Sequence, residues 1–136
     1  MQRFAKYPWW RRWFGSRSER AAARFLRRLG HRILAHNVHT KAGEIDLISL
    51  DGGTVVIVEV RSTESDDIER TAASVDRAKQ KRVTESALAF LQPRGLLDAA
   101  VRFDVLILSW PPDRREPRVE HFPHAFEATG RFQMFS

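Results

Sequence analysis

Two runs of branched apolar residues flank a Gly-Gly pair in residues 43–62, GEIDLISLDGGTVVIVEVRS. This pattern predicts a β-hairpin whose two-residue turn is Gly52-Gly53, because glycine readily adopts the positive φ that such turns require. A carboxylate interrupts each run, Asp46 in the first and Glu59 in the second. An unpaired buried charge is costly, so strands that bury these two acids need a cation nearby. This requirement constrains the fold and the function together.

The register of the hairpin decides whether the two carboxylates meet. With the Gly-Gly turn, Asp46 lies opposite Glu59, and Glu44 lies opposite Arg61. A turn shifted by one residue changes the partners but keeps these side chains on one face. The compensating cation is then an internal Arg or Lys, or a divalent metal such as Mg²⁺, which uses one or two carboxylates together with water and phosphate oxygens. The spacing also fits a sheet face in solvent, with the acids paired to Arg61 and another cation.

The rest of the chain predicts helices that would cover the hairpin. A first helix begins at Ser16 or Ser18, and a second runs from about residue 74 to about residue 91. Residues 31–38 and 101–110 are expected strands, and residues 62–73 are expected to form a loop. A short strand or turn is expected at residues 118–126. The expected buried helix positions are Ala22, Phe25, Leu26, Leu29, Ala78, Ala87, Leu88 and Leu91.

Charge is distributed unevenly along the chain. Residues 1–32 hold ten Lys or Arg and one acid, while the remainder holds 13 Lys or Arg and 16 acids. A cationic N-terminal part of the chain favours a polyanionic partner, either nucleic acid or an anionic membrane surface. We divide the chain into a basic, aromatic segment over residues 1–15, expected to be flexible or loosely docked, and a single domain over residues 16–136. The chain has no cysteine and no apolar run long enough to span a bilayer, so we expect a cytoplasmic protein.

The blocks around the two carboxylates resemble a known group of enzymes. GEIDLI at residues 43–48 and VEVR at residues 58–61 are similar to the motif of the PD-(D/E)XK nuclease superfamily. More closely, the chain resembles the YraN-like family, small bacterial proteins akin to Holliday-junction resolvases, over about residues 15–126. The further blocks that carry this resemblance are Glu19, Asn37, Val75, Lys79, RFDV at residues 102–105 and HAF at residues 124–126.

The resemblance implies an α/β fold with a restriction-endonuclease-like αβββαβ core, in which helices flank a mixed sheet. It implies that Asp46, Glu59 and the carbonyl of Val60 hold Mg²⁺ or Mn²⁺, with Glu19 as a further acidic contributor. The implied reaction is metal-dependent hydrolysis of phosphodiester bonds in DNA or RNA, branched or structured. Junction-cutting relatives tend to be dimers, so a homodimer is expected by analogy.

Position 61 departs from the superfamily pattern, which has lysine there. The lysine pKa of about 10.4 can fall enough for proton exchange, whereas that of arginine, above about 12, cannot. Three outcomes remain open: Arg61 clamps the phosphate, another lysine (Lys41 or Lys79) reaches the site, or the protein binds nucleic acid without cutting it. The candidate catalytic residues are Glu19, Asp46, Glu59 and Arg61, and the candidate phosphate contacts are Arg17, Arg20, Arg24, Lys41, Lys79 and Arg82.

Other features are weighed against this hypothesis. The Trp- and Arg-rich terminus leaves open a membrane-surface or protein-interaction adaptor, although a membrane partner is less expected than nucleic acid. His36 with His39, and His121 with His124, are spaced as in some zinc sites, but the spacing is more often incidental. Asp104 lies within an expected buried strand, where a structural hydrogen-bond acceptor is the favoured role.

Overall fold

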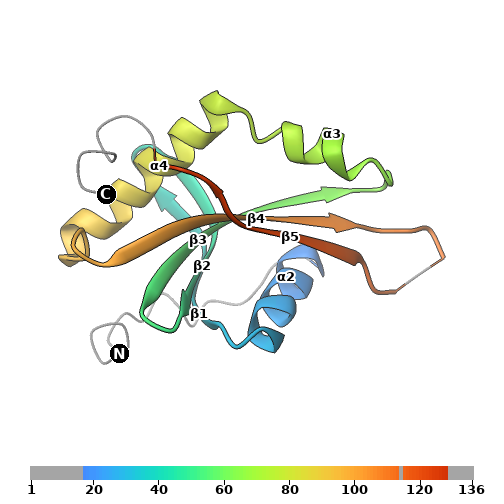
Figure 1. Cartoon of the computed structure of the whole chain (residues 1–136), viewed down its shortest axis with the longest axis horizontal. Helices are drawn as coiled ribbons and strands as arrows, with labels where there is room; N and C mark the ends of the chain where they lie inside the picture. The colour runs from blue at the N-terminus through green and yellow to red at the C-terminus, as the bar shows by residue number, and fades with distance from the viewer. Residues whose placement is uncertain (1–16, 114, 129–136) are drawn as a thin grey trace.

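The structure is a computed structural model that describes residues 17–113 and 115–128 (Figure 1). Within these residues the order of elements is a helix, a three-stranded meander, two helices, a strand and an edge strand. The elements are α2 (Arg17–Arg28), β1 (Arg32–Thr40), β2 (Gly43–Asp51), β3 (Thr54–Thr63), α3 (Ile68–Ala73), α4 (Arg77–Leu91), the 3₁₀ helix η2 (Gln92–Arg94), β4 (Ala100–Ser109) and β5 (Arg118–Phe126). The predicted basic segment, residues 1–15, lies outside the described residues.

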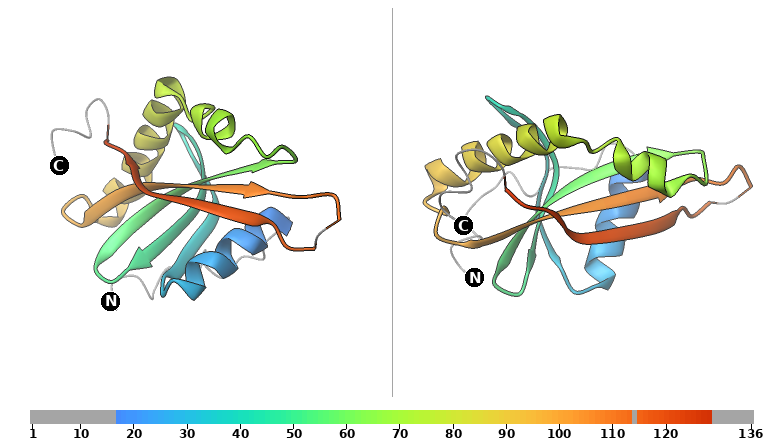
Figure 2. Two further views of the ribbon diagram at one scale, coloured as in Figure 1. Left: turned by 45° about the vertical axis from the view of Figure 1, so that its right-hand side comes forward. Right: turned by 45° about the horizontal axis from the view of Figure 1, so that its top comes forward.

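One five-stranded sheet in the order β1-β2-β3-β4-β5 organises the molecule. β3 pairs with β4 in parallel, and the other neighbours are antiparallel. The parallel pair arises because the chain leaves β3, crosses through α3 and α4, and re-enters the sheet at β4. Figures 1 and 2 show α3 and α4 on one face of the twisted sheet and α2 on the other. This mixed sheet flanked by helices is the α/β, restriction-endonuclease-like fold that the sequence predicts.

Apolar side chains fill both faces of the sheet. Ile48 and Ile57 pack with Phe90 of α4 on one face, while Leu47 and Val58 pack with α2 on the other. β4 is buried from Phe103 to its end, as its apolar run predicts. The sheet is therefore covered, and the alternative of acids on an open, solvated face is wrong for this hairpin.

The hairpin has the predicted register. The β2–β3 pairs run from Asp51↔Thr54 at the turn to Leu47↔Val58, and Gly52 has a φ of 61°. The pairing ends at Leu47↔Val58, so Asp46 and Glu59 are the next residues beyond the paired part of β2 and β3. The hairpin therefore delivers the two carboxylates to the same end of two central strands.

Residues 62–73 are not the loop that we predict. β3 continues to Thr63, and α3 begins at Ile68 after Asp67, whose side chain accepts a hydrogen bond from the backbone N–H of Arg70. Only Ile68 and Ala72 pack from α3 onto the sheet side chains. A six-residue helix with two such positions is too short to show a helical period in the sequence.

Two predicted buried helix positions are also wrong. Leu29 lies just past the end of α2 and is 51% exposed, while the small Ala21 and Ala23 are buried against the sheet instead. Ala78 is exposed because α4 begins at Arg77, capped by Asp76, so Ala78 belongs to a first turn that faces outward. α2 begins at Arg17, in agreement with the predicted start at Ser16 or Ser18, and the Ser18 hydroxyl oxygen accepts a hydrogen bond from Trp110 Nε1 at 3.1 Å. None of the helices in the described ranges is long and apolar enough to cross a bilayer.

Candidate metal and nucleic-acid site

The carboxylates of Asp46 and Glu59 converge where the paired part of β2 and β3 ends. Asp46 Oδ2 accepts a hydrogen bond of 2.8 Å from the backbone N–H of Val60. Besides burial, the charge of Asp46 acts on the Glu59 carboxyl and raises its pKa. Glu59 is only 3% exposed, and Asp46 is half-buried. The two acids therefore form one pair withdrawn from solvent, as the hairpin register predicts.

Val60 adds a third oxygen to this pair. In an extended strand the N–H and C=O of one residue point to the same side, so the Val60 carbonyl is directed towards Asp46. Two carboxylates and a carbonyl fit Mg²⁺ or Mn²⁺, which complete their shell with water and phosphate oxygens. Across residues 17–113 and 115–128 there is no group of three or more His, Cys, Asp or Glu that could hold a metal. Two carboxylates and one carbonyl leave further coordination positions for water and phosphate oxygens.

Two cations from different elements approach Glu59. Lys79 Nζ, in the first turn of α4, lies 3.4 Å from Glu59 Oε2, and an Nη of Arg61 lies 3.5 Å from the same oxygen. Burial and the charge of Asp46 raise the pKa of Glu59 to about 7, against the attraction of Lys79 and Arg61. Glu59 therefore changes its protonation state near neutral pH.

Arg61 has one hydrogen-bond donor that is available for a ligand. Its Nε is buried and meets no hydrogen-bond acceptor among the described residues. A buried donor without an acceptor is unfavourable, and an anionic oxygen bound beside Glu59 is the type of group that satisfies it. Arg61 therefore suits an anion clamp, the first of the three outcomes predicted for this position.

Of the two lysines proposed to replace the missing superfamily lysine, the structure brings only one to the acids. Lys79 contacts Glu59 directly. Lys41 is exposed in the turn between β1 and β2, where it lines a separate cleft with Phe90 and Arg94. Lys79 is thus the lysine placed to act beside Asp46 and Glu59.

Glu19 pairs with Asn37 of β1. It projects from α2, and its Oε1 accepts a hydrogen bond of 2.8 Å from Asn37 Nδ2. Asn37 lies between the β1–β2 pairs His36↔Leu47 and Val38↔Ile45, so its neighbour across the strands is Asp46. Its φ of 49° breaks the regular strand at this point. Asn37 therefore ties β1 to α2 through Glu19, a connection that sequence reasoning missed although it noted Asn37.

The predicted phosphate contacts do not form one patch. Arg17 lies over the Trp110 ring at 3.9 Å, Arg24 lies 3.8 Å from Glu116, and Arg20 is exposed. These three arginines belong to α2, across the sheet from α4, which carries Lys79 and the exposed Arg82 (Figure 2). The residues beside the carboxylates are therefore those of α4.

A second polar cluster was predicted only in part. Asp104 is fully buried and accepts hydrogen bonds from Arg102, His121 and the backbone N–H of His124. Burial acts to raise the pKa of Asp104, but these hydrogen bonds outweigh it and lower the pKa below its usual value. Asp104 is thus the structural acceptor that we predict. His121 is held by this carboxylate, and His39 lies 3.0 Å from Glu44.

A covered mixed sheet with two carboxylates at the ends of adjacent strands is the arrangement of restriction-endonuclease-like α/β proteins. Residues 18–108 match the family described as "Uncharacterised protein family UPF0102". The chain belongs to this family, which is the YraN family, and the predicted resemblance is confirmed.

Similar UPF0102 proteins occur in several bacteria. One from Rhodopirellula baltica is 43% identical over 119 residues, which cover 85% of this chain and 71% of the relative. One from Anaeromyxobacter dehalogenans is 41% identical over 117 residues, 86% of each chain. One from Geobacter sulfurreducens is 39% identical over 114 residues, 83% of this chain and 88% of the relative.

Proposed function

We propose that this protein is a metal-dependent endonuclease that hydrolyses phosphodiester bonds in DNA or RNA. The observation that carries the proposal is the convergence of Asp46 and Glu59 on one sheltered point beside Lys79 and Arg61. Two adjacent acids withdrawn from solvent destabilise a fold unless a cation joins them, and a raised pKa at such a pair is typical of functional sites. The family and fold support the proposal without naming an activity.

Each residue of the site has its own role in the proposed hydrolysis. Asp46, Glu59 and the Val60 carbonyl would hold Mg²⁺ or Mn²⁺, which would supply positive charge for the phosphate and a water of lowered pKa. Arg61 donates to the phosphate oxygens. Lys79, whose Nζ lies 3.4 Å from Glu59 Oε2, would orient the attacking water.

Cleavage assays test the proposal. Branched DNA, single-stranded DNA and structured RNA are incubated with the full chain in Mg²⁺ or Mn²⁺. We expect cutting that falls by about a hundredfold or more in Asp46→Ala and in Glu59→Ala, and that EDTA abolishes. Glu85→Ala, which removes an exposed acid of α4, serves as the matched control and retains activity. Cutting that persists in Asp46→Ala contradicts the proposal.

A second candidate function, nucleic-acid binding without cutting, is favoured by one observation. Arg61 occupies the superfamily's lysine position, and an arginine cannot exchange a proton there. This candidate predicts binding that weakens with salt and no hydrolysis in any metal. If Arg61→Lys then gains cleavage, the site is a degenerate nuclease site. A homodimer and the membrane or protein adaptor role of the N-terminal segment stay predictions.

A further inference from the structure

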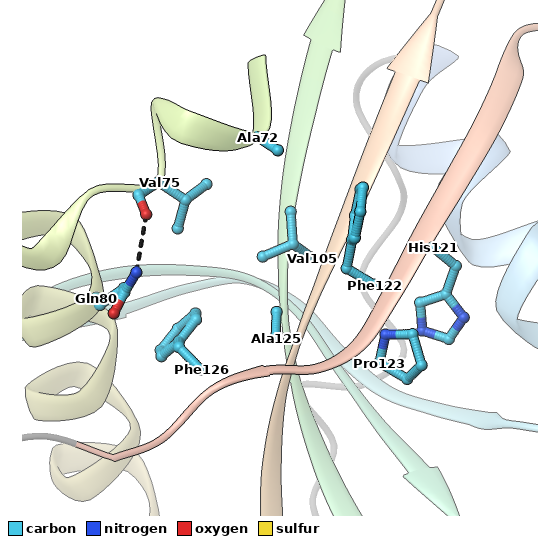
Figure 3. A pocket seen from close by; sticks show the side chains of 9 residues that line it. All are labelled: Ala72, Val75, Gln80, Val105, His121, Phe122, Pro123, Ala125 and Phe126. Carbon is cyan, nitrogen blue, oxygen red and sulfur yellow. Dashed lines mark hydrogen bonds between the residues drawn. The ribbon is translucent and has the colours of Figure 1, made fainter. Parts of the chain in front are cut away.

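A pocket of about 330 Å³ lies beside the carboxylate pair, between the α3–α4 connection and strands β4 and β5 (Figure 3). Figure 3 shows side chains from the two helices and from the two strands on opposite sides of the same space. Among the described residues, no Lys, Arg, Asp or Glu belongs to its lining. The lining residues are Ala72, Val75, Gln80, Val105, Phe122 and Phe126, with His121, Pro123 and Ala125 at the β5 side.

The pocket is one strand away from the candidate metal site. Val105 is the register partner of Glu59 in the parallel β3–β4 pair, and neighbouring strands lie about 4.8 Å apart. Partners in a sheet project to the same face, so Val105 and Glu59 are side by side. From the helical side, Gln80 directly follows Lys79, whose ammonium contacts Glu59. The pocket therefore begins one strand away from Glu59 and one helix residue after Lys79.

The walls combine aromatic surface with one amide. Phe122 and Phe126 supply rings, and Phe126 is itself stacked on Phe103 with 5.0 Å between ring centroids. Gln80 Nε2 donates to the Val75 carbonyl at 3.0 Å, which fixes the amide orientation because an amide oxygen cannot donate. The Gln80 amide still offers one N–H and one carbonyl oxygen. An apolar slot with one donor and one acceptor suits a flat, uncharged heterocycle.

We propose that this pocket binds one unpaired nucleobase of the nucleic acid whose phosphates lie at Lys79 and Arg61. The inference rests on the proposed function and adds a preference to it. The phosphates and the base of the ligand meet surroundings of different charge. Lys79 and Arg61 lie beside the carboxylates, whereas the described lining of the pocket has no Lys or Arg. A paired base is stacked inside its duplex and enters such a pocket only when extruded. The site therefore selects single-stranded or branched positions.

Binding in EDTA, where no metal-dependent cutting occurs, tests the pocket by itself. The probes are a labelled oligothymidine, an abasic strand of equal length, a hairpin duplex of equal length, and an oligouridine for RNA, all followed by fluorescence anisotropy. Ala72→Phe fills the pocket from α3. Ala73→Phe is the matched control, because Ala73 is the next residue of the same helix, is exposed, and does not line the pocket. If circular dichroism shows that Ala72→Phe does not fold, Phe122→Ala tests the pocket in its place, because it removes a stacking ring.

We expect the wild type to bind oligothymidine or oligouridine about tenfold more tightly than the abasic strand and the duplex, in line with base–aromatic stacking. Ala72→Phe and Phe122→Ala lose this preference, and Ala73→Phe keeps it. Equal affinity for base-bearing and abasic strands overturns the inference, as does full preference in Ala72→Phe. A dimer that Ala72→Phe dissociates, with unchanged oligothymidine affinity, assigns the pocket to a second copy and also overturns it. If the full chain cuts in Mg²⁺ but shows no preference for base-bearing over abasic strands, the pocket inference fails and the proposed function stands.

Discussion

Replacing Glu59 by Gln tests the electrostatics of the carboxylate pair without any substrate. Glutamine keeps the size of the side chain and removes its titration. In the folded chain, burial and the charge of Asp46 raise the pKa of Glu59 from 4.5 to about 7. The folded state therefore holds the proton more tightly than the unfolded state does. Glu59 contributes stability that is fully present below pH 4.5 and is lost as the pH rises through about 7.

The size of the effect follows from the gap between the two pKa values. Each pH unit of that gap corresponds to about 1.4 kcal/mol, so wild-type protein loses on the order of 3 kcal/mol of unfolding free energy from this group between about pH 4.5 and about pH 8. The glutamine of the Glu59→Gln variant cannot ionise and avoids the loss. We therefore expect the free energy of unfolding of this variant, measured relative to wild type, to rise by about 3 kcal/mol over this range.

Urea unfolding in EDTA, followed by tryptophan fluorescence and circular dichroism, measures this difference. All other titrating groups are common to both proteins, so the subtraction isolates Glu59. Glu64→Gln, which removes an exposed acid in the loop after β3, controls for the general loss of a negative charge. A difference that stays flat with pH, or that falls as the pH rises, refutes the argument that Glu59 is buried beside Asp46.

The remaining predictions concern the ion and the two supporting contacts. Affinity for Mn²⁺ falls as the pH drops from about 8 to about 6, because Glu59 must release its proton to bind; isothermal titration calorimetry measures this, and Glu59→Gln removes the dependence. Asp104→Asn lowers the free energy of unfolding by about 3 kcal/mol at about pH 7, measured by urea unfolding, because it leaves Arg102 without its buried partner. That deficit shrinks as the pH falls below 3.8, where the unfolded wild-type chain takes up a proton at Asp104 before the folded chain does. Asn37→Ala costs about 2 kcal/mol in thermal unfolding, through the lost bond to Glu19 and the strained φ, and Asn37→Gly costs less.

The sequence predicts the central hairpin and its register because two local rules agree there. The Gly-Gly turn sets the pairing, and alternation then places Asp46 and Glu59 on one face whichever of the two turns forms. The buried run of β4 is equally readable, since both faces of a central strand are apolar. These segments needed no knowledge of distant contacts.

Elements that depend on tertiary contacts could not be read in the same way. α3 is stabilised by one N-cap and by two apolar residues that pack on the sheet. Two apolar positions are too few to give a helical period in the sequence. The burial of Ala21 in place of Leu29 depends on where α2 ends and how closely it approaches the sheet. The role of Asn37 appears only when β1, β2 and α2 are assembled, because its partner Glu19 is 18 residues away. The separation of the α2 arginines from Lys79 likewise follows from the packing of helices on opposite faces.

A crystal structure of the full chain soaked with Mn²⁺ at about pH 8 tests the central claim most directly, through the anomalous scattering of the ion. We expect one anomalous peak at about 2.2 Å from carboxylate oxygens of Asp46 and Glu59, with the Val60 carbonyl as a further ligand. A structure at saturating Mn²⁺ with no peak between these two side chains, and with Glu59 still paired to Lys79 and Arg61, contradicts the account.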